Sequence, residues 1–154
     1  MIRTFLFFSF LFIFSAFIIS GKDNHSDKVI GTYWSPDKDG KISIYKKNGK
    51  YYGKSVASNT PGLKDVKNPD PKLRDRIVLG QDVFFAFVYD EGDDEYINGN
   101  IYNPLDGNTY SAKMWLKDNN LKLRGYLGLP IFGITKTMEP VKCLPKLYTK
   151  KLIK

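Results

Sequence analysis

The sequence predicts an all-β fold: one antiparallel up-and-down barrel of eight strands, with a long, partly helical loop at residues 57–82. Three observations support it. Short segments alternate apolar and polar residues at the period of a β-strand. Turn-forming residues such as Asn48-Gly49 separate these segments. No segment repeats its apolar residues at the helical period for long enough to form a major helix.

Eight segments qualify as strands. The pair 41–45 and 50–56 flanks Asn48-Gly49, which readily adopts the positive φ angles of a tight hairpin turn. The segment 83–89 has apolar residues at both its odd and its even positions, as expected for a strand covered on both faces. Short connections make the later strands a meander. Besides these three, the predicted strands are 29–34, 95–102, 109–116, 121–127 and 131–138.

Residues 57–82 interrupt the strand pattern with Pro61-Gly62 and a charged run that ends at Arg76. Asn68 can cap a helical turn that begins at Pro69, where the N–H that proline lacks is not needed. Pro71 prevents a long helix. We therefore expect a loop with about one helical turn.

The chain divides into four parts. Residues 1–21 are predicted to be a signal peptide, with Arg3, an apolar run at 5–19 and the small residues Ser20-Gly21. An uncleaved membrane anchor is the alternative, but the apolar run is shorter than the ~20 residues of a spanning helix. Residues 22–28 are polar and form a flexible lead, 29–141 are the barrel domain, and 142–154 are a basic tail. Export predicts a protein of the periplasm or the cell exterior that is soluble after cleavage.

The net charge of +8 is concentrated in the tail, where five lysines follow the last acidic residue, Glu139. A solvated tail and contact with an anionic envelope surface are the two interpretations. Nucleic acid is not an expected partner, because no nucleic-acid-binding motif is present. The single cysteine, Cys143, excludes an internal disulfide, and we expect it to be a packing residue.

Four blocks carry a resemblance to known families: Gly31-Thr-Tyr-Trp34, the run from Asn68 to Arg76, the run from Tyr102 to Tyr110, and the run from Leu121 to Gly128. The first block, with an arginine on a late strand, is similar to the lipocalin pattern. This likeness implies that Arg124 stacks on Trp34 in a cation–π contact.

Together, in this order, the blocks resemble the bacterial exported domain-of-unknown-function family DUF2147 over residues 30–141. Asn103 and Met138 depart from that family's usual Asp and Trp, and the first change removes a carboxylate. The resemblance implies a lipocalin-like or fatty-acid-binding-like barrel, without an established activity. Its structural signature residues are Trp34, Asn68, Asp75, Tyr102, Gly107 and Gly125.

Several kinds of chemistry lack the residues they need. The lone histidine, His25, leaves a hydrolytic triad without a base in the barrel, and one His with one Cys cannot form a usual zinc site. We therefore predict no catalytic residues, no metal and no cofactor. An enzyme remains an alternative only if Asp65, Asp75 or Asp106 has a strongly raised pKa in a cleft.

Binding of a small apolar or amphipathic molecule is the predicted function. Inward apolar side chains would line the interior, among them Phe84 and Leu127, and arginines near the mouth would suit a carboxylate or phosphate head group. The predicted ligand-binding residues are Arg74, Arg76, Phe85, Phe87, Tyr110, Met114, Leu123 and Arg124.

The alternative is an envelope-associated interaction module, in which the same residues fill the barrel and its outer surface is functional. In that case Tyr51, Tyr52, Trp115 and Tyr126 would be exposed on the outside.

Overall fold

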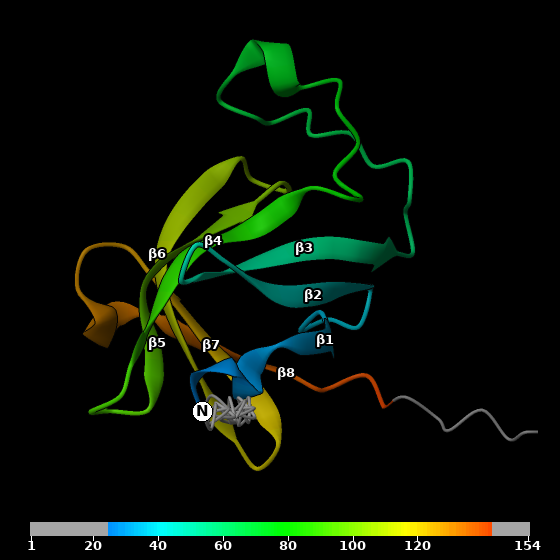
Figure 1. The fold of residues 1–154 in the computed structure, drawn as a ribbon. Coiled ribbons are helices and arrows are strands. Elements are labelled where there is room, and N and C mark those ends of the chain that lie inside the picture. Colours follow the sequence, from blue (N-terminus) through cyan, green and yellow to red (C-terminus); the bar gives the residue numbers. More distant parts are fainter. Residues whose placement is uncertain (1–24, 143–154) are drawn as a thin grey trace, which may run out of the picture.

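The computed structural model describes residues 25–142, which form an eight-stranded antiparallel sheet curled into a barrel (Figure 1). Each strand pairs with the next one in the chain, so the predicted all-β, up-and-down architecture is confirmed. The strands are β1 (Gly31–Trp34), β2 (Gly40–Lys47), β3 (Lys50–Ser58), β4 (Asp82–Asp90), β5 (Glu95–Asn103), β6 (Asn108–Lys117), β7 (Asn120–Tyr126) and β8 (Ile134–Met138). The predicted signal peptide (1–21), the first residues of the lead (22–24) and the tail beyond Lys142 lie outside the described residues.

The ring closes between β1 and the segment that follows β8. The Trp34 N–H donates to the Glu139 carbonyl at 2.9 Å, and the Val141 N–H donates to the Thr32 carbonyl at 2.8 Å. Tyr33 and Pro140 form an isolated bridge between these bonds. Strand β8 itself has ladder partners only on β7, so the barrel is nearly closed.

Three short 3₁₀ turns accompany the strands: η1 (His25–Val29), η2 (Pro71–Leu73) and η3 (Pro130–Phe132). The turn η2 confirms the helical turn predicted in the long loop, but it begins at Pro71 and Asp70 caps it by accepting from the Lys72 N–H at 3.0 Å. The predicted last strand is shorter than expected. It begins only at Ile134, because η3 occupies its predicted start and Pro130 opens that turn without an N–H to give to a ladder.

A backbone irregularity explains the apolar run in β4. Ala86 has a φ of 59°, which breaks the alternation of faces, so Phe84 and Phe87 are both buried inside although they are three residues apart. The Phe87 ring lies against Gly99 of β5, where an added Cβ would be 2.3 Å from the ring. Phe85 is only half-buried and Val88 is exposed, so β4 is not covered on both faces.

Large side chains fill the barrel at the end next to η1. Tyr51 and Tyr96 meet edge to face with ring centroids 4.9 Å apart. Val29 of η1 is completely buried against this group. The fully buried side chains of this part also include Ile44, Phe87, Met114, Leu121 and Met138.

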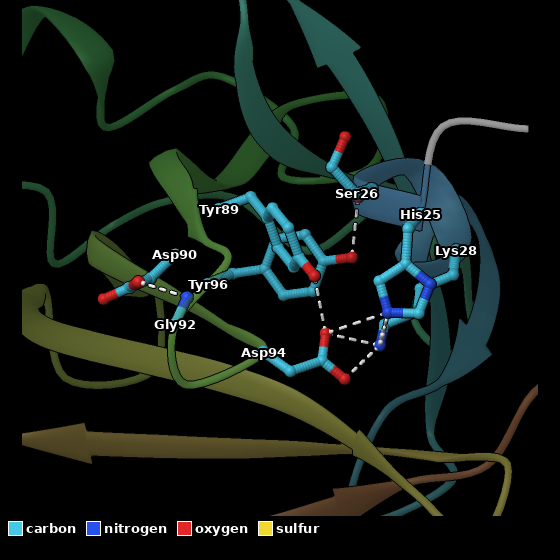
Figure 2. Close-up of polar contacts among 8 residues, drawn as sticks. All are labelled: His25, Ser26, Lys28, Tyr89, Asp90, Gly92, Asp94 and Tyr96. Carbon is cyan, nitrogen blue, oxygen red and sulfur yellow. Dashed lines mark hydrogen bonds and ion pairs between the residues drawn. The ribbon is translucent and has the colours of Figure 1, made fainter. Parts of the chain in front are cut away.

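Residues 25–28 of the predicted flexible lead form η1 together with Val29, and this turn covers the filled end of the barrel (Figure 2). The Tyr96 hydroxyl donates to the Ser26 carbonyl at 2.7 Å, and Lys28 pairs with Asp94 in the β4–β5 turn. Tyr89 also donates to Asp94, at 2.7 Å. The long loop between β3 and β4 lies at another part of the barrel than η1, and it projects away from the strands (green in Figure 1).

Candidate functional site

A cavity of about 270 Å³ lies where the long loop meets the barrel, and it is partly open to solvent. Its lining comes from strands β2, β3, β4, β5 and β7, from the β1–β2 and β5–β6 turns and from the long loop. This volume lies just below the ~300–1,000 Å³ typical of ligand pockets, so the cavity suits a small molecule or part of a larger one. The lining residues are Ser35, Pro36, Asp39, Gly40, Ile42, Ser55, Ser58, Leu63, Val78, Val83, Phe84, Ile101, Tyr102, Asn103, Pro104, Leu105 and Leu123.

The walls of the cavity are mostly apolar. Ile101 and Leu123 come from strands of the barrel, and Leu63 and Val78 come from the long loop. The Val78 N–H donates to the Leu63 carbonyl at 3.0 Å, which holds the two loop residues side by side. The two apolar loop residues therefore form one side of a space that strands and hairpin turns line elsewhere.

The polar groups of the lining carry no positive charge. Lysine, arginine and histidine are absent from the lining residues of this cavity in the described part of the chain. Serine hydroxyls and the Asp39 carboxylate are present instead, and Asp39 accepts from the Ser35 hydroxyl at 2.6 Å. The polar side chains of the lining are therefore hydroxyls, the Asn103 amide and one carboxylate, and none of them is a cation.

A buried carboxylate fixes the long loop beside the cavity. Asp65 is only 1% exposed and accepts from the Tyr102 hydroxyl, from Asn68 Nδ2 at 2.7 Å and from Arg76 Nη2 at 2.9 Å. Desolvation alone would raise the pKa of Asp65, but the hydrogen bonds from Tyr102, Asn68 and Arg76 outweigh it, so this pKa lies below its usual range. Because Tyr102 also lines the cavity, this network joins the loop to the wall of the site.

Two further contacts tie the loop down. Arg74 Nε donates to the Asn68 carbonyl at 2.9 Å. At the β5–β6 turn, Gly107 has a φ of 76°, and an added Cβ would lie 2.0 Å from the Lys67 carbonyl oxygen. Asp75 makes only an exposed pair with Lys64. Asn68, Tyr102 and Gly107, three of the predicted signature residues, thus share one structural task, which is to attach the loop to the barrel.

The structure brings one of the eight predicted ligand-binding residues, Leu123, to the cavity. Phe87 and Met114 are fully buried in the filled part, and Phe85 is half-buried with Asn100 as its ladder partner. Arg74, Arg76, Tyr110 and Arg124 bind protein groups outside the cavity lining. Leu127, also expected inside, is 70% exposed.

The predicted stacking of Arg124 on Trp34 is wrong. Arg124 Nε donates to the Pro130 carbonyl at 2.7 Å, and the other guanidinium nitrogens bind Ile131 and Thr135. The cation over the Trp34 ring is Lys41 of the neighbouring strand, with Nζ 4.4 Å from the ring centroid. The next residue, the signature glycine Gly125, lies close to the side chains of Ile101 and Tyr110 on strands β5 and β6.

The tyrosines and tryptophan expected on the outer surface differ in burial. Tyr51 is a core residue, so its predicted exposure is wrong: it shares the buried face of β3 with Gly53, and Tyr52 next to it lies on the opposite face. Tyr52 is half-buried and stacks on Tyr45 with ring centroids 5.8 Å apart. Trp115 and Tyr126 are also half-buried.

The lining residues that sequence reasoning missed had two recognisable signals. Ile42, which lines the cavity, and Ile44, which is buried in the core, alternate with Lys41 and Ser43 on β2, and this alternation marks an inward face. Leu63 and Val78 are isolated apolar residues in a charged loop, a pattern that is typical of anchor points on a core.

The three carboxylates considered for acid chemistry all have lowered pKa values. For Asp106 the hydrogen bonds from Asn108, Tyr110 and Asn103 outweigh desolvation, and for Asp75 the hydrogen bond from Lys64 is the main cause. In all three carboxyl groups, Asp65 included, the surroundings thus favour the ionised form. Within residues 25–142, no group of three His, Cys, Asp or Glu side chains is placed to hold a metal ion. No helix in that range is long and apolar enough to cross a membrane.

Comparison with known proteins supports the fold. The structure is similar to that of a protein from Helicobacter pylori, described as "Protein HP1028 from the human pathogen Helicobacter pylori belongs to the lipocalin family". The TM-score is 0.64 at 26% sequence identity, over 73% of this chain and 82% of that one. A search of curated proteins finds no match. The model of the family described as "Uncharacterized protein conserved in bacteria (DUF2147)" matches residues 31–139. The chain therefore belongs to the DUF2147 family, and its barrel is lipocalin-like.

Proposed function

We propose that this protein binds a small, mostly apolar molecule without negative charge in the cavity between the long loop and the barrel. The observation that carries the proposal is the cavity itself, a space of about 270 Å³ with mostly apolar walls. Its strand side is part of a hydrogen-bonded barrel, and its loop side is attached through the Asp65 network. Such a largely preformed, apolar space with a few polar groups is the usual form of a small-molecule site.

The charges of the lining narrow the ligand class. A carboxylate or phosphate head group was expected from the arginines, but Arg76 is committed to Asp65 and Arg74 to a backbone carbonyl. Asp39 would repel an anion at the opening. An uncharged ligand with a hydroxyl or carbonyl fits better, because Ser55 and Ser58 offer hydroxyls to orient it. Export through the predicted signal peptide belongs to the same proposal and would place this site outside the cytoplasm.

A cavity-filling substitution tests the proposal. Val78→Phe adds a ring to a lining residue of the loop, and Val56→Phe makes the same change at an exposed position of β3 that does not line the cavity. We expect the neutral fluorescent probe N-phenyl-1-naphthylamine to bind the parent protein and Val56→Phe equally, and Val78→Phe on the order of tenfold more weakly.

Native mass spectrometry of the same three proteins, isolated from their own cells, would follow any molecule that copurifies. A bound mass retained by Val56→Phe and lost from Val78→Phe supports the site and identifies the ligand. Equal probe binding by the two variants, with both folded, would contradict it.

A further inference from the structure

The connection between β7 and β8 exposes apolar side chains to an unusual degree. We call residues 127–134 the apolar loop. Its exposed fractions run from 64% for Leu129 to 77% for Phe132. Contiguous exposed apolar residues of this kind mark interaction sites in soluble proteins. The set comprises Leu127, Leu129, Ile131, Phe132 and Ile134.

The apolar loop is held in its shape by polar contacts beneath it. Arg124 donates to the carbonyls of Pro130 and Ile131, at 2.7 and 3.0 Å, and to the Thr135 hydroxyl at 2.8 Å. Gly133 packs so closely on β7 that an added Cβ would lie 2.8 Å from the Gly125 carbonyl oxygen. These contacts hold the loop in one conformation, in which its apolar side chains are exposed. The backbone of the loop is the orange turn in Figure 1.

The two strands that flank the apolar loop, β7 and β8, carry charges of one sign. The segment from Asn119 to Met138 contains no aspartate or glutamate, although the chain has 16 acidic residues. It contains Lys122, Arg124 and Lys136. Arg124 lies directly beneath the loop, and Lys136 follows Ile134 by two residues on β8. The two strands that carry the apolar tip thus bear basic and no acidic side chains.

We propose that the apolar loop docks the protein on a phospholipid bilayer that contains anionic lipid, with the tip in the interfacial region and the basic residues on the head groups. A protruding tip suits a deformable apolar layer, and each lysine or arginine near an anionic surface adds to the attraction. A second copy of the chain is a poorer partner, because a two-fold contact through this tip would bring the basic side chains of β7 and β8 of both copies together. The docking does not depend on the ligand of the cavity.

Vesicle flotation tests the docking with the protein as the cells process it. The vesicles contain equal parts of phosphatidylglycerol and phosphatidylcholine, or phosphatidylcholine alone. The variant Ile131→Ser/Phe132→Ser removes two side chains from the tip. The matched control Val66→Ser/Ile77→Ser removes two exposed apolar side chains from the long loop. An apolar N-terminus, if retained, would be common to all of these proteins.

We expect the parent and the control to bind the anionic vesicles and to release them as salt is raised. The tip variant should bind on the order of tenfold more weakly. A Lys122→Gln/Lys136→Gln variant should lose the preference for anionic lipid. The proposal would be overturned if the parent and the tip variant bound the vesicles equally or if the parent did not bind at all. It would also be overturned if sedimentation showed that the parent is a dimer and the tip variant a monomer.

Discussion

At the scale of single residues, one buried carboxylate organises the candidate site. Asp65 would be costly to bury alone, and the structure satisfies it with Tyr102, Asn68 and Arg76. The same contacts hold the long loop against β5 and so keep the cavity wall in place. The surroundings also raise the pKa of the Tyr102 hydroxyl to about 12. Desolvation is the main cause, and the hydrogen bond to Asp65 adds to it.

Removing one hydroxyl tests this network. We expect Tyr102→Phe to lower the free energy of unfolding by about 1–3 kcal/mol, because a charged, buried acceptor loses a donor. Tyr126→Phe is the matched control, a half-buried tyrosine outside the network, and should change the free energy of unfolding by less than about 0.5 kcal/mol. Urea denaturation at neutral pH measures both, and equal losses in the two variants would contradict the role given to Asp65.

At the scale of elements, η1 acts as a plug that polar contacts attach to the filled end of the barrel. The Asp27 carboxylate accepts from the Tyr51 hydroxyl at 2.6 Å and from Lys46 Nζ at 2.7 Å. The hydrogen bonds from Lys46 and Tyr51 lower the pKa of Asp27. Its contribution to stability is therefore complete above the ordinary value of 3.8 and is lost as the pH falls through the lower folded value.

The plug predicts a pH-dependent effect of one substitution. Asp27→Asn should destabilise the protein by about 1 kcal/mol at pH 7, a value kept small because the carboxylate is partly exposed. This difference from the parent should shrink at pH values below the folded pKa, because the protonated carboxyl group of the parent is then as neutral as the Asn amide of the variant. Asp37→Asn, at an exposed position, is the control. Denaturation curves measured across the acid range would contradict the account if the Asp27→Asn effect did not depend on pH.

At the scale of the whole molecule, the strands could be predicted from sequence because alternation and hairpin turns are local. Asn48 and Gly49, for example, have the expected positive φ angles of 52° and 75°. The site could not be predicted in the same way. Its walls come from segments far apart in the chain, and the irregularity at Ala86 changes which phenylalanines of β4 point inward. The prediction that arginines line the mouth does not hold for another reason. Arg76 forms an ion pair with a buried carboxylate, Asp65, and no local sequence pattern reveals that this carboxylate is buried.

The central claim is that the open part of the barrel is a binding site while the part next to η1 is filled core. Methyl NMR of the folded protein, titrated with N-phenyl-1-naphthylamine, tests it most directly. We predict saturable shifts for the methyl groups of Leu63, Val78, Ile101 and Leu123, with those of Val29, Ile44 and Leu121 unchanged. Shifts confined to Leu129 and Ile131 of the apolar loop, or no saturable shift in the cavity, would contradict the claim.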